Sequence, residues 1–250
     1  MNLLELVRYC DEYLRIEQVR DYPEALNGLQ VGNGGAVHRI AAAVDICGAT
    51  VRMAAEQGTD LLIVHHGLFW GGLRPLVGPQ LERVGGLIRH GIALYGAHLP
   101  LDCHPEVGNA VLLARTLGLT VRGDFGWWNE QPVGVWGELE LDRDAFGRRL
   151  ATALGHPAKA MGFGPEVVRR VGIVTGAGGS FIRAAAAEGL DTYVTGEGTH
   201  HTYFDAEELR LNVYYGGHYA TETFGVRALA EHLGSKFGIP WAFLDHPTGL

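Results

Sequence analysis

The chain has 250 residues, of which 47% are hydrophobic and 19% are charged, and its formal net charge is −8 at pH 7. This balance is typical of a globular protein and excludes a disordered chain, and no apolar stretch is long enough to span a bilayer. The negative charge argues against nucleic acid as a partner, because polyanions are held largely by positive charge on the protein.

The three cysteines, Cys10, Cys47 and Cys103, are widely spaced along the chain. This scattered, odd-numbered set forms neither a disulfide framework nor the spacing of a zinc ribbon. The first residues include acidic side chains and lack the basic region that begins a signal peptide. We therefore expect a protein of the reducing cytoplasm that does not associate with a membrane.

The first half of the chain alternates between helix and strand patterns. It opens with an amphipathic helix that the side chain of Asn2 can cap. Short apolar runs predict strands, and longer segments between them predict helices, most of which end near a glycine. The expected strands are 38–46, 61–64 and 92–98, and the expected further helices are 49–58, 81–91 and 108–119.

A glycine- and tryptophan-rich segment follows, and we place a domain boundary there, so that one domain spans 1–126 and the other 127–250. The alternation then resumes. Its expected strands are 137–141, 168–176 and 191–196, its expected helices are 143–155, 180–190 and 221–238, and 206–218 carries a helix end into a strand. Such alternation predicts α/β domains, in which helices pack on mainly parallel sheets.

Side chains that can bind a metal stand at the carboxyl ends of four predicted strands. In open α/β sheets, ligands bind beyond these ends. Adjacent residues within a strand point to opposite faces, but at a strand end both can lean into one cavity. The side chains at these ends are His65, His66, His98, Asp102, His104, Glu197, His200, His201, His218 and Glu222.

Imidazole and carboxylate groups suit zinc, manganese or ferrous iron. Asp102 and Glu222 are candidates to bridge or cap two such ions, and Glu222 shares a helix face with His218, four residues earlier. Two ions about 3.5–4 Å apart can polarise a carbonyl or phosphoryl group and provide hydroxide at neutral pH, so hydrolysis is the expected reaction. His98 and His201 are candidate general acids or bases.

Several of these features also have simpler interpretations. His104 precedes a proline and can be a turn residue, and His200 and His201 can serve only to cap a turn. The stretch VTGAGGSF, residues 174–181, follows a strand and opens a helix. It can be a plain glycine turn, or its amides can contact a nucleotide phosphate.

Five stretches of the sequence together resemble the Nif-three-like family of dinuclear metal-centre proteins, often labelled GTP cyclohydrolase I type 2 homologues. They are NGLQVG (27–32), IVHHGLFW (63–70), LYGAHLPLDCHPEVGNA (94–110), TGEG (195–198) and GGHYATETFGVRAL (216–229). The resemblance implies two α/β domains that enclose a two-metal site in a cleft, in the short bacterial form of the family. It also implies a ring-shaped homohexamer, His98 beside the metals, and five metal ligands: His65, His66, Asp102, His218 and Glu222.

Two classes of function follow from these features. The first is a two-metal hydrolase for a nucleotide or related small molecule, which could open the guanine ring of GTP. The second is a non-enzymatic metal-binding scaffold that acts through its oligomeric ring. Threading of nucleic acid through the ring fits poorly with the acidic chain.

Overall fold

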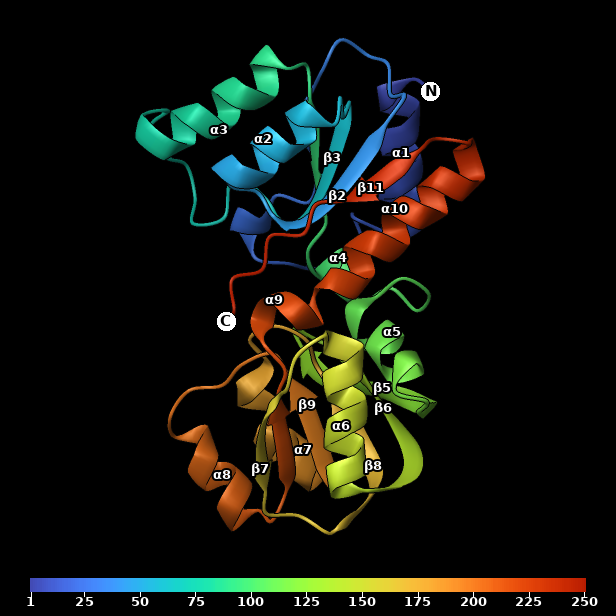
Figure 1. Cartoon of the computed structure of the whole chain (residues 1–250), viewed down its shortest axis with the longest axis vertical. Coiled ribbons are helices and arrows are strands. Elements are labelled where there is room, and N and C mark those ends of the chain that lie inside the picture. The colour runs from blue at the N-terminus through green and yellow to red at the C-terminus, as the bar shows by residue number, and fades with distance from the viewer. The chain divides into compact units, whose positions relative to one another are not determined.

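The structure, a computed structural model, describes residues 1–250 and divides the chain into two compact units (Figure 1). Unit 1 comprises Met1–His104 and Gly225–His246, and unit 2 comprises Pro105–Phe224 and Pro247–Leu250. The boundary expected at 126/127 falls instead within strand β5 (Thr120–Trp128) of unit 2. The expected division also differs at the C-terminal end, where Gly225–His246 belong to unit 1. The last strand of the chain pairs there with a sheet that is otherwise built from the first half of the chain.

The sheet of unit 1 has five strands in the order β1-β4-β3-β2-β11. All neighbours are parallel except β1, which is antiparallel to β4. Strands β2 and β3 are almost continuously buried, as expected for a sheet that helices cover on both faces. The strands are β1 (Gly28–Val31), β2 (Ile40–Asp45), β3 (Leu61–His66), β4 (Ala93–Gly96) and β11 (Trp241–Phe243).

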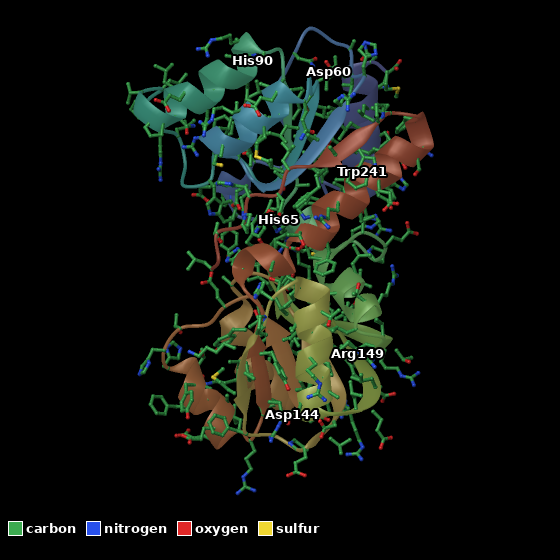
Figure 2. The ribbon with its side chains drawn as sticks, viewed as in Figure 1. Asp60, His65, His90, Asp144, Arg149 and Trp241 are labelled. Carbon is green, nitrogen blue, oxygen red and sulfur yellow. The ribbon has the colours of Figure 1, made fainter.

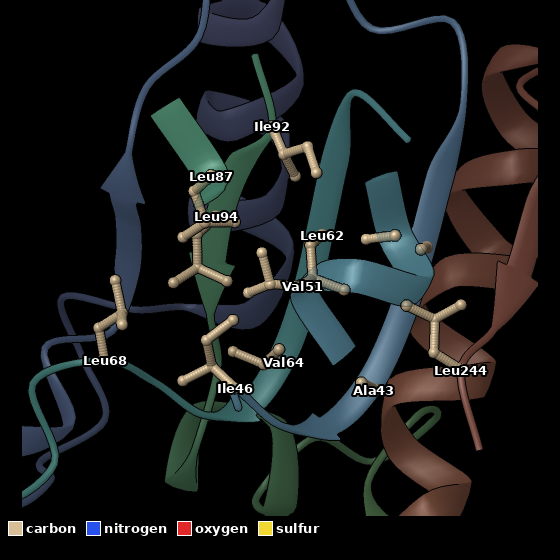
Figure 3. Packing of buried hydrophobic residues seen from close by; sticks show 12 residues of the cluster. Ala43, Ile46, Val51, Leu62, Val64, Leu68, Leu87, Ile92, Leu94 and Leu244 are labelled. Carbon is tan, nitrogen blue, oxygen red and sulfur yellow. The ribbon is translucent and has the colours of Figure 1, made fainter. Parts of the chain in front are cut away.

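Helices α2 and α3 cover one face of this sheet, where Val51 and Leu87 pack on Leu62 and Leu94 of the strands (Figure 3). Helices α1 and α10 lie against the other face (Figure 1), and the rings of Tyr9 on α1 and His232 on α10 stack with centroids 5.8 Å apart. The cap expected for the first helix is confirmed, because the Asn2 side chain accepts the Leu4 amide at 2.9 Å. The helices of this unit are α1 (Leu3–Leu14), α2 (Gly48–Glu56), α3 (Gly78–Arg89), α4 (Leu99–Asp102) and α10 (Thr223–Phe237), with a 3₁₀ turn at Pro23–Ala25.

The sheet of unit 2 has six strands in the order β5-β6-β8-β9-β10-β7. Only β8, β9 and β10 run parallel, so this sheet is mixed rather than mainly parallel. Helices α5 and α6 pack on it through a core that includes Leu113 and Leu150. The further strands are β6 (Gln131–Asp142), β7 (Lys159–Gly162), β8 (Val167–Ile173), β9 (Thr192–Thr195) and β10 (Asn212–Tyr215). The helices are α5 (Asn109–Thr116), α6 (Arg143–Leu154), α7 (Ile182–Ala187), α8 (Thr202–Glu208) and α9 (His218–Thr221), with a 3₁₀ turn at Gly178–Phe181.

The α/β class expected from the sequence is confirmed in both units. The glycine- and tryptophan-rich segment, which looks irregular in sequence, forms the β5–β6 hairpin, and Asn129 and Glu130 at its turn both have positive φ. None of the helices combines the length and the apolar character that crossing a bilayer requires.

Candidate metal centre

Strands β3 and β4 run parallel and deliver three histidines to one edge of the sheet of unit 1. Val64 pairs with Gly96, so His65 and His66 on β3 end at the level where the chain leaves β4 towards His98. Figure 2 labels His65 and Asp60, which lie at opposite ends of β3. The ligand nitrogens of the three histidines all lie within 4.8 Å of one another. The strand-end pattern therefore assembles a real cluster of potential ligands.

Each of these imidazoles donates a hydrogen bond from Nδ1 to an oxygen. The acceptor for His65 is the carbonyl oxygen of Ala97, at 2.8 Å. The acceptor for His66 is Oδ1 of Asp45, also at 2.8 Å, and that for His98 is Oδ1 of Asp21, at 2.9 Å. A proton fixed on Nδ1 leaves the lone pair on Nε2, which is the form of imidazole that binds a metal.

The NGLQVG stretch supports the loop that carries His98. The side chain of Asn27 accepts the backbone amide of His98 at 2.7 Å and donates to Asp21 at 2.7 Å. Asp21 also accepts the amide of Leu99. Burial alone would raise the pKa of Asp21, but the hydrogen bond and charge of His98, with the Asn27 and Leu99 donors, outweigh burial and lower it. Asp21 is thus held as a carboxylate behind His98.

Gln30 of the same stretch supports the loop after the histidine pair. Its Oε1 accepts the amide of Leu68 at 2.8 Å, and its Nε2 donates to the carbonyl oxygens of Ala25 and Leu26. A Cβ at Gly67 would lie 2.2 Å from Nε2 of Gln30. The glycine that follows the two histidines is therefore needed for the close approach of Gln30.

Asp102 closes the cluster of unit 1. It ends the short helix α4, its side chain is only 8% exposed, and its Oδ2 lies 3.4 Å from Nε2 of His65. Two ligands on one tetrahedral zinc ion, each bonded at about 2.1 Å, are about 3.4 Å apart. His65 and Asp102 are therefore spaced as ligands that share an ion.

Unit 2 carries a second, smaller set of ligand atoms around α9. His218 Nε2 lies 3.2 Å from Oε2 of the buried Glu222, and its Nδ1 donates to Oε1 of Glu197 at 2.6 Å. Burial by itself would lower the pKa of His218, but the hydrogen bonds and negative charges of Glu222 and Glu197 outweigh it and raise the pKa to about 9. Gly176 packs closely against this set, because a Cβ at this position would lie 2.1 Å from Oε1 of Glu222. A cation bound at Nε2 would replace a proton that two carboxylates already attract.

The structure places the remaining candidates apart from these clusters. His201 is exposed at the start of α8 and contacts the hydroxyl of Thr199 at 3.1 Å, and His200 packs edge-on against Phe204. His104 is buried and its Nε2 contacts the carbonyl oxygen of Tyr13 at 3.1 Å.

The glycine-rich stretch at 174–181 uses its backbone amides within the protein. The amide of Gly176 donates to Thr221, and that of Gly178 donates to Thr195. The contacts favour the simpler interpretation of this stretch, a glycine turn that packs closely.

Four supporting residues do not emerge from the sequence as part of the site: Asp21, Asn27, Gln30 and Asp45. Asp45 could have been found, because it ends β2 and pairs in register with His66 on the neighbouring parallel strand. Glu197 stands among the predicted strand-end side chains, but the sequence does not indicate its bond to His218. Asn27 and Gln30 lie in a quoted motif, and only the structure shows which loops they hold.

Known proteins resemble this chain over almost its whole length. The family model described as Duf34/NIF3 (NGG1p interacting factor 3) matches residues 1–248. The GTP cyclohydrolase 1 type 2 homolog of Deinococcus radiodurans is 48% identical over 249 residues, which cover 98% of this chain and 94% of the relative. The protein of the same name from Halobacterium salinarum is 46% identical over 256 residues and covers all of both chains. The crystal structure of TTHA1606 from Thermus thermophilus superposes with a TM-score of 0.92 at 44% identity, again over 100% of both chains. The chain therefore belongs to the DUF34/NIF3 family.

Proposed function

We propose that the chain is a metal-dependent hydrolase that binds two divalent ions through the ligand sets described above. The chain passes between the units two residues after Asp102 and again two residues after Glu222, so each set stands at a crossing of the chain. Unit 1 offers more ligand atoms than unit 2. The proposed ligands are His65, His66, Asp102, His218 and Glu222.

The observation that carries this proposal is the hydrogen bonding of the histidines. All four imidazoles at these sites, His65, His66, His98 and His218, donate from Nδ1, one to a backbone carbonyl and three to carboxylates. Histidines that bind metals almost always donate their other ring N–H in this way. The mixed imidazole and carboxylate set suits zinc, manganese or iron.

When bound, two divalent ions would polarise the bond under attack and lower the pKa of a water towards neutrality. His98 would provide proton transfer from the protein itself. Its Nδ1 donates to Asp21, which leaves Nε2 as the ring atom that can accept a proton and return it. We assign the role of general acid and base to His98 rather than to the exposed His201.

We further propose that the substrate is a nucleotide or a related small molecule. The relatives named above carry the name GTP cyclohydrolase 1 type 2 homolog, which makes GTP the first substrate to test. A non-enzymatic, oligomeric scaffold is the alternative. The three cysteines form no disulfide, which fits the cytoplasm. Large exposed apolar side chains favour self-association, and we propose a ring-shaped hexamer as the assembly. These side chains are Leu73, Leu76, Val77, Leu81 and Ile88.

The hydrolase proposal predicts that protein loaded with zinc, manganese or iron converts GTP to a ring-opened product. Mass spectrometry of the nucleotide pool measures the conversion, with chelator-treated protein as the control. Turnover that depends on the added metal supports the proposal. A protein that binds two ions but leaves GTP and a panel of other nucleotides intact would favour the scaffold instead.

Replacing Asp45 by asparagine tests the role of the hydrogen bond to His66. The amide keeps the size of the carboxylate but lacks its charge, so His66 becomes a weaker ligand, and we expect metal affinity to fall about tenfold. Competition with a chromophoric chelator measures the affinity. Asp144→Asn, an exposed change on α6 of the other unit, is the matched control and should leave the affinity unchanged.

A further inference from the structure

A hollow opens beside His66 at the edge of the sheet of unit 1, with a volume of about 220 Å³. This volume corresponds to about seven water molecules at roughly 30 Å³ each, and it is smaller than the 300–1,000 Å³ or so of a complete ligand pocket. It therefore suits one group of a substrate whose remainder extends towards the histidines. Every residue that lines it belongs to unit 1.

The lining of this hollow is positively charged. Arg74 and Arg83 both face it, and the only carboxylate among its lining residues, Asp45, is engaged by Nδ1 of His66. Arg83 is half-buried and held by neutral acceptors, the carbonyl of Ile46 and the side chain of Gln80, so its charge is not cancelled. Neither of these two arginines is among those that form ion pairs with a carboxylate.

The backbone before Arg74 is shaped to let its side chain fold back. Gly71 and Gly72 both have positive φ, at 89° and 84°. A Cβ at Gly71 would lie 2.6 Å from Nη2 of Arg74. Glycine at this position therefore permits the guanidinium to lie against the turn, in the lining of the hollow.

Trp70 adds a flat apolar surface to the same hollow. Trp70 is 42% exposed, and its ring centroid lies 4.6 Å from that of His98 and 5.8 Å from that of His66. An indole in this position can stack on a planar group of a ligand. The hollow thus offers two guanidinium groups and one aromatic face directly beside the proposed ligands.

We propose that this hollow binds an oxyanion of the substrate, phosphate or carboxylate, through Arg74 and Arg83, with Trp70 against a planar part of the same molecule. Guanidinium groups form paired, charge-assisted hydrogen bonds to both kinds of oxyanion. This inference rests on the proposed function, because only that function makes the bound molecule a substrate. It specifies the substrate class as an anionic small molecule.

The test is a titration of the metal-loaded protein with inorganic phosphate and, separately, with acetate, followed by tryptophan fluorescence. In the double variant Arg74→Gln/Arg83→Gln we expect the affinity for the preferred anion to fall about tenfold or more, because two charge-assisted hydrogen bonds are lost. Preference for phosphate or for acetate identifies which oxyanion the hollow takes. Replacing Trp70 by leucine should lower the affinity for guanosine monophosphate more than the affinity for inorganic phosphate. Broadening of the ³¹P resonance of each ligand measures its binding.

The matched control is Arg52→Gln/Arg89→Gln, because these arginines line a separate cavity between α2 and α3 of the same unit. It removes the same charge and should change anion affinity less than about twofold. An equal loss in both double variants, or no loss in Arg74→Gln/Arg83→Gln, would overturn the proposal.

Metal content separates this inference from the proposed function. Arg74→Gln/Arg83→Gln should retain the metal content of the unsubstituted protein, since neither arginine is a ligand. If the protein binds no metal but chelator-treated samples still bind phosphate through these arginines, the metal centre fails and the anion site stands. If two ions bind and Arg74→Gln/Arg83→Gln has the phosphate affinity of the unsubstituted protein, the anion site is wrong and the metal centre is supported.

Discussion

Replacing Asp102 by alanine is expected to remove at least one of the two proposed divalent ions and, with it, the proposed hydrolase activity. The carboxylate is buried and lies 3.4 Å from Nε2 of His65, so the variant loses a ligand that no water can replace with equal charge. His66→Ala should behave in the same way. Inductively coupled plasma mass spectrometry measures the metal content per chain. Two ions retained in either variant would show that the ligand assignment is wrong.

His104→Ala is the control for Asp102→Ala, because it lies two residues away and also removes a buried polar side chain. His104 contacts the carbonyl oxygen of Tyr13, and the two rings lie 4.3 Å apart between centroids at an angle of 43°. We expect the free energy of unfolding to fall by about 2 kcal/mol while metal content stays unchanged. Loss of metal in this variant would show that His104 belongs to the site.

Replacing Gly176 by alanine is expected to weaken metal binding at least tenfold, although every proposed ligand residue is retained. The new Cβ would lie 2.1 Å from Oε1 of Glu222, so the carboxylate must move away from His218. Supporting changes of this kind typically cost about 10–100-fold in metal affinity. A chelator competition assay measures the affinity.

Gly155→Ala controls for the backbone strain of the previous variant. Gly155 has φ of 81° and Gly176 has φ of 62°, so alanine is strained at both, but nothing lies within 4 Å of a Cβ at Gly155. Both variants should lose about 1–2 kcal/mol of stability, and only Gly176→Ala should lose metal affinity. Equal metal affinity in the two variants would mean that the position of Glu222 does not matter for binding.

The sequence predicts the local part of the fold well and the long-range part poorly. The first helix follows from its cap at Asn2 and its apolar face, and β2 and β3 follow from runs that are buried on both faces. Strand β11 is not apparent in the sequence, because it has three residues and its partner β2 lies two hundred residues earlier. The turn at Asn129 and Glu130 has the positive φ of a tight hairpin, but it lacks the glycine that usually marks one.

For the site too, the sequence predicts the ligand cluster well and the long-range contacts that support it poorly. The strand-end rule brings His65, His66 and His98 to one place, because parallel strands end at one edge. The residues that orient these side chains are harder to infer. Asp21 follows a helix and meets His98 across 77 positions of sequence, a contact set by tertiary packing. Arg74 reaches the hollow through a two-glycine turn that leaves no periodic pattern.

The central claim is that two divalent ions bind per chain through histidines whose Nδ1 protons are already committed to oxygen. The most direct measurement is the metal content of protein purified without a chelator, before and after incubation with zinc, manganese or iron. We expect close to two equivalents per chain, falling in Asp102→Ala. Little metal that none of the three ions restores would contradict the claim and would leave the histidines of β3 as buried, hydrogen-bonded turn residues.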